Sequence, residues 1–164
     1  MKLIISDIDG VVADCSHRLS WAKAKLYTEF YSDANVLRDE PIESGITFLQ
    51  MLDGGLTSVT RIVFCSGRNE TCKDATREWL RKKVKLDYDA LYMRKDGDHR
   101  KSEVTKVELV EEIIRSYIAR GEDITEIYYI DDDPNNVKAV CEQYNSITGI
   151  TFGVERMKKN EDNA

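Results

Sequence analysis

Short apolar runs alternate with longer amphipathic stretches along the chain. The runs cover residues 3–6, 59–65, 90–93, 127–130 and 147–152, and their length suits strands that are covered on both faces. Apolar side chains recur at steps of three and four, as in helices, within 19–30, 42–49, 70–82, 102–120 and 134–144. Pro41 and Pro134 stand where the first turn of a helix favours proline. Strands that alternate with helices predict βαβ units.

This alternation predicts an α/β fold, Rossmann-like and three-layered (α/β/α), with a mainly parallel five-stranded sheet. One domain is expected over residues 1–156, followed by a flexible polar tail at 157–164. The segment 16–40 is longer than one crossover helix requires, so a small helical insertion is expected after the first strand. It is either a cap over the site or an extra helix packed on the sheet.

The composition favours a globular domain and excludes two classes of function. Of the 164 residues, 41% are hydrophobic and 33% charged, and no apolar run approaches the length of a membrane span. The net charge of -6 argues against a protein that coats nucleic acid, although one strand end can still be gripped. The four cysteines show no metal-ligand spacing, so we expect reduced thiols in the cytoplasm.

The strongest chemical signal directly follows the first apolar run. Asp7 and Asp9 are two residues apart, so an extended chain places both on one side, and Gly10 permits a sharp turn and a close approach of phosphate. Ligands of open α/β sheets bind beyond the carboxyl ends of the strands. Carboxylates this close repel each other unless a cation or a shared proton intervenes, which points to magnesium. DxDG also occurs in turns and calcium loops, so the motif needs a second signal.

Three consecutive aspartates after the fourth apolar run supply that signal. If the two strands are neighbours, Asp131 or Asp132 reaches a metal held by Asp7 and by the main-chain carbonyl of Asp9. Ligands that are all oxygen suit Mg²⁺. The simpler role for the cluster is capping of the next helix, which Asp133 is expected to provide in either case.

Phosphate ligands and a catalytic cation are expected nearby. The run 59–65 ends in Ser66 and Gly67, where the hydroxyl and nearby amides can hold phosphate oxygens. A lysine should stabilise the charge that spreads over a phosphoryl group in transfer. Lys106 falls on the apolar arc of its helix and is favoured over Lys101, which points to the polar side. The alternative for Lys106 is a solvated surface position.

Arginines also follow the third apolar run. Arg94 and Arg100 reach the same edge of the sheet, where arginine suits forked recognition of phosphate. Surface ion pairs are the equal alternative for both. His17 and His99 have no recognisable nucleophile as a partner, so we expect them to be surface histidines.

The chain resembles the haloacid dehalogenase-like hydrolase superfamily over most of its length. The resemblance is carried by four elements in this order: DIDGVV, CSGR, a lysine and DDD. Within that superfamily, residues between about 7 and 137 resemble the 3′-phosphatase domain of phage polynucleotide kinase. The residues that carry this resemblance are Arg18, Cys65-Ser66-Gly67-Arg68, Trp79-Leu80, Met93-Arg94, Gly97-Asp98-His99-Arg100-Lys101 and Lys106.

The resemblance implies roles for individual residues. Asp7 is then the nucleophile and Asp9 the general acid/base; Arg18, Arg68 and Lys106 handle phosphate, and the metal ligands are Asp7, Asp9, Asp131 and Asp132. The chain departs from that family by carrying Ser102 and Glu103 where acidic residues are usual, and by a longer segment between 14 and 41. It has no GxxxxGK[ST] loop, so no kinase activity is expected.

We therefore expect an Mg²⁺-dependent phosphomonoesterase that acts on the 3′-phosphate of a nucleic-acid end through an aspartyl-phosphate. Two alternatives stay open: a phosphatase of free nucleotides or other small phosphate esters, and a receiver-like phosphoacceptor domain without enzymatic activity. Asp9 argues against the receiver, which needs no proton shuttle two residues after its phosphorylated aspartate. No feature indicates a membrane or an obligatory protein partner.

Overall fold

Five parallel strands form the central sheet, in the order β5-β4-β1-β6-β7. The computed structural model describes residues 1–54 and 59–153, so the tail expected at 157–164 lies outside the described residues. The strands are β1 (Lys2–Ser6), β4 (Thr60–Asn69), β5 (Ala90–Arg94), β6 (Glu126–Asp131) and β7 (Ile147–Thr151). All five follow the apolar runs of the sequence, which confirms the predicted α/β fold. Strand β4 extends four residues beyond its predicted end, through the SGR motif.

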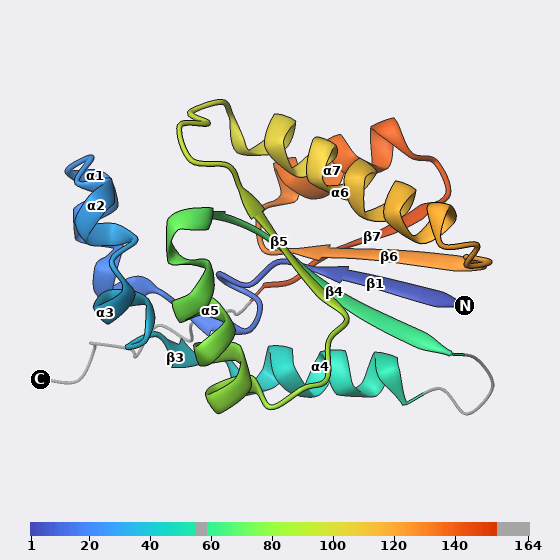
Figure 1. Cartoon of the computed structure of the whole chain (residues 1–164), viewed down its shortest axis with the longest axis horizontal. Coiled ribbons are helices and arrows are strands. Elements are labelled where there is room, and N and C mark those ends of the chain that lie inside the picture. The colour runs from blue at the N-terminus through green and yellow to red at the C-terminus, as the bar shows by residue number, and fades with distance from the viewer. Residues whose placement is uncertain (55–58, 154–164) are drawn as a thin grey trace, which may run out of the picture.

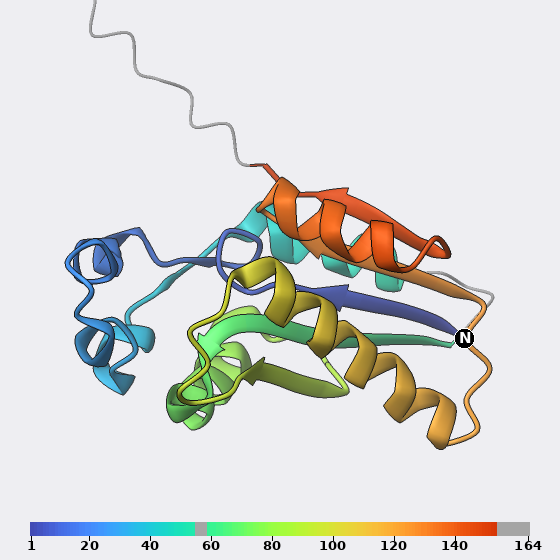
Figure 2. The same ribbon diagram turned by 90° about the horizontal axis from the view of Figure 1, so that it is seen from above.

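Helices cover both faces of this sheet and complete three layers (Figures 1 and 2). One face carries α4 (Glu43–Asp53), the short turn η2 (Glu70–Cys72), α5 (Lys73–Trp79) and its π-helical continuation η3 (Leu80–Val84). The other face carries α6 (Ser102–Ala119) and α7 (Pro134–Gln143). The Rossmann-like arrangement is therefore the one that the sequence predicts.

Strand β1 sends its buried side chains alternately into these two layers. Ile4 belongs to the apolar core under α4 and α5, whereas Leu3 and Ile5 belong to the core under α6 and α7. Continued for two more residues, this alternation turns Asp7 toward α6. Asp131, at the end of the neighbouring strand β6, faces the same helix, because both carboxylates contact a lysine of α6.

The predicted insertion is present as several short helices. Strand β2 (Ala13–Asp14) leads into η1 (Ser16–Arg18), α1 (Leu19–Lys23), α2 (Tyr27–Phe30) and α3 (Asp33–Val36), and β3 (Glu40–Pro41) returns antiparallel to β2. The helical pattern breaks where Lys25 adopts a φ of 58° and where the side chain of Ser32 caps α3. The short helices stand beyond the carboxyl ends of the strands instead of packing on a sheet face (Figure 1).

One prediction of a helix start is wrong and the other is confirmed. Pro41 lies in β3, and α4 begins only after Ile42, whose main-chain N–H donates to the carbonyl of Val12 at 2.8 Å. Pairing with the first strand of the insertion thus overrides the local preference of proline. Pro134 is the first residue of α7, and the side chain of Asp133 caps that helix as expected.

The four cysteines are free thiols in the structure. Within the described ranges, no helix is long and apolar enough to cross a membrane.

Candidate active site

Three carboxylates meet at the carboxyl edge of the sheet. Asp7 follows β1, and Asp131 and Asp132 stand at the end of the neighbouring strand β6. One oxygen of each can be chosen so that all three lie within 4.8 Å of one another. Ligands on opposite sides of an Mg²⁺ ion are about 4.2 Å apart, since each bond is about 2.0–2.1 Å long. The cluster therefore fits Mg²⁺ after a small adjustment.

A buried amide beside the cluster supports this fit. Asn136 donates through Nδ2 to both oxygens of Asp131, at 3.2 and 3.1 Å. Its own Oδ1 is buried and accepts no hydrogen bond from any described residue. Mg²⁺ usually keeps several water ligands in proteins. A water ligand of a bound Mg²⁺ would supply the donor that this amide oxygen lacks.

Lys106 lies between two of the carboxylates. Its Nζ is 2.8 Å from Oδ1 of Asp7 and 3.1 Å from Oδ2 of Asp131, and it donates to the carbonyl of Cys65 at 2.7 Å. Burial disfavours the charged amine, but the two carboxylates outweigh burial and raise the pKa of Lys106. The lysine is thus a fixed positive charge beside Asp7, on the helical face that the apolar arc predicts.

The orientation and charge of Asp7 follow from its neighbours. Its Oδ1 accepts from the Lys106 amine and from the main-chain N–H of Ile8 at 2.8 Å, so the carboxylate is held from two sides. Burial raises the pKa of Asp7 to about 8, and the charges of Asp131 and Asp9 add to this effect while Lys106 opposes it. A divalent cation between the carboxylates would relieve this repulsion and favour the ionised form.

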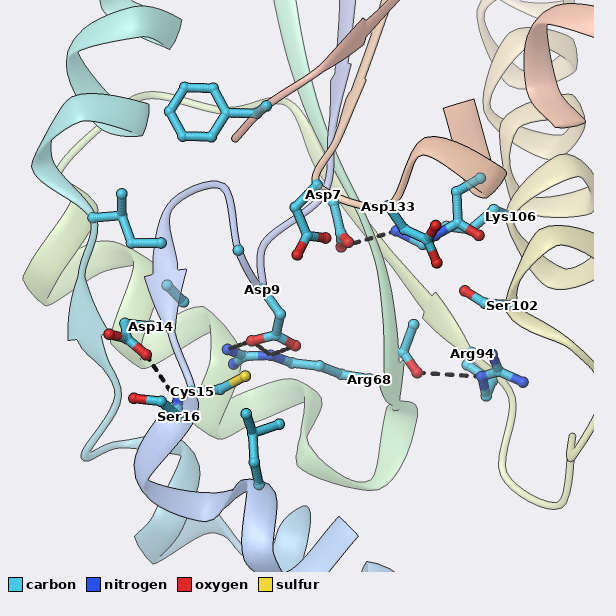
Figure 3. A pocket seen from close by; sticks show the side chains of 18 of the residues that line it. Asp7, Asp9, Asp14, Cys15, Ser16, Arg68, Arg94, Ser102, Lys106 and Asp133 are labelled. Atoms are coloured by element: carbon cyan, nitrogen blue, oxygen red, sulfur yellow. Dashed lines mark hydrogen bonds and ion pairs between the residues drawn. The ribbon is translucent and has the colours of Figure 1, made fainter. Parts of the chain in front are cut away.

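Asp9 faces away from this cluster and points toward Arg68 (Figure 3). It also accepts a hydrogen bond from Arg18. Arg68 donates to Asp9 from Nη2 at 2.6 Å and from Nε at 3.0 Å, and Arg18 donates from Nη2 at 3.3 Å. Burial disfavours the carboxylate, but the guanidinium groups outweigh burial and lower the pKa of Asp9. Its side chain is therefore ionised and oriented, while a metal contact through its main-chain carbonyl stays a prediction.

Asp39 is a site residue that the sequence analysis missed. Its buried carboxylate accepts from Nε and Nη2 of Arg18, at 2.8 and 2.9 Å, and from Nη2 of Arg68 at 2.6 Å. Asp39 thus holds the two guanidinium groups that hold Asp9. Nothing in its local sequence distinguishes Asp39 from an exposed aspartate, because its partners come from distant positions.

Two predicted phosphate ligands, Arg18 and Ser66, are fully buried in the structure. Arg18 is fully buried and donates to Asp39, Asp9 and the carbonyl of Phe30, so it positions Asp9 and is not exposed to substrate. Ser66 is also fully buried and accepts from the main-chain N–H of Arg68.

Arg100 is absent from the cavity for a different reason. It is exposed and pairs with Asp98 and Glu108, at 3.0 and 2.6 Å. Of the two alternatives for this arginine, the surface ion pair is the one that the structure shows.

The remaining candidates, apart from the buried Asp131, line one cavity of about 760 Å³. Its polar lining includes Asp7, Asp9, Gly10, Gly67, Arg68, Arg94, Lys106 and Asp132. Figure 3 shows Asp14, Cys15 and Ser16 on one wall, with Arg94, Ser102 and Lys106 on the opposite wall. Apolar side chains from the insertion and from other elements also line it: Leu19, Phe30, Tyr31, Ile42 and Phe152. The insertion therefore forms part of the wall.

Gly10 is required by the geometry of the cluster. Its φ is +78°, and a Cβ at this position would lie 2.1 Å from Oδ2 of Asp132. Replacing Gly10 by alanine should displace Asp132 and weaken Mg²⁺ binding on the order of 10- to 100-fold, as lost support of a metal site typically does. Calorimetric titration with Mg²⁺ measures this change.

The matched control is Gly97→Ala. Gly97 has a φ of +77° and no atom within 4 Å of its hypothetical Cβ, so the variant has the same backbone strain without the clash. If both alanine variants bound Mg²⁺ equally well, the close approach of Gly10 to Asp132 would not matter for the metal.

The fold and the site together define a phosphatase of the haloacid dehalogenase-like class. The family model described as the polynucleotide kinase PNKP phosphatase domain matches residues 1–140, and the chain belongs to this family. It is accordingly a phosphoric monoester hydrolase.

A curated protein and a solved structure resemble this chain. A protein of Autographa californica nuclear polyhedrosis virus, provisionally named a bifunctional polynucleotide kinase/RNA ligase, is 30% identical over 115 residues, which are 70% of this chain and 15% of that protein. A chain of the Pnkp1/Rnl/Hen1 complex superimposes with a TM-score of 0.65 at 20% identity, over 93% of this chain and 47% of its own. This chain therefore spans less than half of either relative.

A third protein shares the fold. The D,D-heptose 1,7-bisphosphate phosphatase of B. bronchiseptica, solved with magnesium and phosphate, superimposes with a TM-score of 0.54 at 18% identity, over 87% of this chain and 76% of its own. At this level of identity the likeness concerns the fold.

Proposed function

We propose that this domain is an Mg²⁺-dependent polynucleotide 3′-phosphatase that works through an aspartyl-phosphate on Asp7. The observation that carries the proposal is the contrast between two carboxylates at the end of β1. Asp7 is tied to Lys106 and to the acidic cluster, whereas Asp9 is tied to Arg68 and Arg18. Membership of the PNKP phosphatase family and the viral relative named as a polynucleotide kinase support a nucleic-acid end as the substrate.

In the first step, a carboxylate oxygen of Asp7 attacks the phosphorus atom in line with the bond to the 3′ oxygen. That bond breaks, and the leaving oxygen takes a proton from the carboxyl group of Asp9. Lys106, fixed beside Asp7, stabilises the charge on the transferring phosphoryl group. The dianionic substrate beside Asp9 raises the pKa of this carboxyl group. Asp9 is then protonated and can donate its proton to the leaving oxygen.

In the second step, Asp9 acts as the base. It removes a proton from a water molecule, whose oxygen attacks the phosphorus of the aspartyl-phosphate. The bond from phosphorus to Asp7 breaks, and inorganic phosphate and free Asp7 carboxylate result. Asp9 has then regained its proton for the next turnover.

The metal site would involve Asp7, Asp131 and Asp132. When bound, Mg²⁺ supplies Lewis-acid stabilisation of the phosphoryl oxygens. Asp131 is held for this task by the hydroxyl of Tyr129 at 2.6 Å and by the main-chain N–H of Asp133 at 2.9 Å. Both contacts orient its oxygens without supplying a competing charge.

The cavity is suited to a leaving group that is larger than an alcohol. A volume of about 760 Å³ lies within the range of about 300–1,000 Å³ usual for sites that bind small organic molecules. Tyr31 and Phe30 of the insertion form an edge-to-face pair on its wall. An apolar and aromatic wall next to charged groups suits a nucleoside attached to a phosphate.

The proposal predicts a preference for the position of the phosphate. With Mg²⁺, kcat/KM for a 3′-phosphorylated oligonucleotide should exceed that for its 5′-phosphorylated counterpart by about tenfold or more, or about 1.4 kcal/mol. Chelation should remove both activities, and added Mg²⁺ should restore them. Steady-state release of inorganic phosphate measures each value.

Two other outcomes would assign a different function. Equal values for 3′ and 5′ esters, together with efficient turnover of mononucleotides, would identify a phosphatase of small esters. Stable phosphorylation of Asp7 without turnover of any ester would identify the receiver-like phosphoacceptor.

A further inference from the structure

The cations that line the cavity differ in how their charge is balanced. Among the described residues these cations are Arg68, Arg94 and Lys106. Arg68 pairs with Asp9 and Asp39, and Lys106 pairs with Asp7 and Asp131. Arg94 has no carboxylate within 4.0 Å in the part of the chain that the structure describes. Its positive charge is therefore available to a ligand.

The guanidinium of Arg94 is nevertheless held in place. Nε donates to the carbonyl of Gly67 at 3.2 Å, and Nη1 donates to the carbonyls of Asp98 and Arg100, at 3.3 and 2.8 Å. A guanidinium has five N–H groups, so these bonds leave the two on Nη2. Nη2 lies 4.0 Å from the point where a Cβ of Gly67 would stand. Gly67 also lines the cavity. Two oriented donors and an unbalanced charge make a suitable contact for an anion.

The position of Arg94 separates this contact from the reacting phosphate. Arg94 ends β5, and β4 lies between β5 and β1. Two strand spacings place its main chain roughly 10 Å from the strand that carries Asp7. The guanidinium of Arg94 cannot move toward Asp7 without losing its hydrogen bonds to these three carbonyls. Lys106 already occupies the position next to the nucleophile.

We propose that Nη2 of Arg94 binds the phosphodiester that precedes the terminal nucleotide of a 3′-phosphorylated strand. This inference rests on the proposed function and adds to it a second phosphate contact, by which the site distinguishes a strand end from a mononucleotide. The ligand class is a single-stranded polynucleotide end with a charged internucleotide linkage. The acidic protein needs no long basic groove for this recognition, because one contact suffices.

The test uses 3′-phosphorylated oligothymidylates that differ in one linkage. In one substrate the last internucleotide linkage is a phosphodiester, and in the other it is an uncharged methylphosphonate. For the parent protein, kcat/KM should be higher for the charged linkage on the order of tenfold, the size of one charge-assisted hydrogen bond. Arg94→Gln should reduce this ratio to about one, and Arg94→Lys should restore part of it.

Arg115→Gln is the matched control. Arg115 is an exposed arginine of α6 that pairs with Glu111, so the variant removes the same charge at a distance from the cavity and should keep the parent's ratio. A parent ratio of one, or an Arg94→Gln variant that keeps the parent's ratio, would overturn the second contact. Arg94→Gln that lowers kcat/KM equally for both substrates would place Arg94 on the terminal phosphate. Failure of the proposed function looks different: either neither oligonucleotide releases phosphate, or 3′- and 5′-phosphorylated oligonucleotides are hydrolysed at equal rates.

Discussion

Asp7→Asn should abolish turnover of every phosphate ester, with a loss of at least about 10⁴-fold in kcat, as expected when a covalent nucleophile is removed. This corresponds to more than about 5.5 kcal/mol of barrier. The amide oxygen of asparagine can still accept from Lys106 and from the N–H of Ile8, so the local packing is preserved. What is lost is the nucleophilic carboxylate oxygen.

The measurement is single-turnover release of phosphate from a 3′-phosphorylated oligonucleotide. Asp74→Asn is the matched control, because Asp74 has a side chain that is 97% exposed on α5 and the same charge is removed. Thermal unfolding of both variants shows whether the fold is intact. An Asp7→Asn variant that kept more than a few per cent of the parent rate would exclude the aspartyl-phosphate pathway.

The positions of Asp7, Lys106 and Asp131 could be predicted because regular secondary structure relates them. The alternation of β1 turns Asp7 toward α6, and the helical period turns Lys106 toward the sheet. Parallel pairing of β1 with β6 then brings Asp131 to the same edge. Each step uses a fixed geometric period, so single residues can be placed from the pattern.

The partners of Asp9 could not be predicted in the same way. The family resemblance implies that Arg18 and Arg68 handle phosphate, and in the structure both donate to Asp39. Asp39 lies in the insertion, where no period relates it to β1 or β4. Its burial results from packing between distant segments, and a buried charge acquires its partners from tertiary structure alone.

The insertion shows a similar limit. Its apolar spacing suggests one helix, but the chain turns at Lys25, and Ser32 caps a new helix four residues before Val36 ends it. Ser32 followed by Asp33 is a recognisable start signal for a helix. The signal that places these helices over the cavity is absent from the local sequence, since it depends on the pairing of β2 with β3.

The second large effect should come from Asp9→Asn, and its size should depend on the leaving group. For a 3′-phosphorylated oligonucleotide, loss of the general acid should lower kcat by about 10²–10⁴-fold. For p-nitrophenyl phosphate, the leaving phenolate is stable without a proton, so the first step should be affected much less. The second step still needs a base to deprotonate water, so the aspartyl-phosphate should accumulate.

The expected result is a burst of one equivalent of nitrophenol per enzyme, followed by slow steady turnover. Arg68 and Arg18 lower the pKa of Asp9 and keep it ionised in the free protein, which is the form that acts as the base in the second step. Asparagine can accept from Arg68 but cannot take a proton, so the variant separates positioning from proton transfer. Equal losses for both leaving groups, without a burst, would show that Asp9 only orients the arginines and that another group moves the proton.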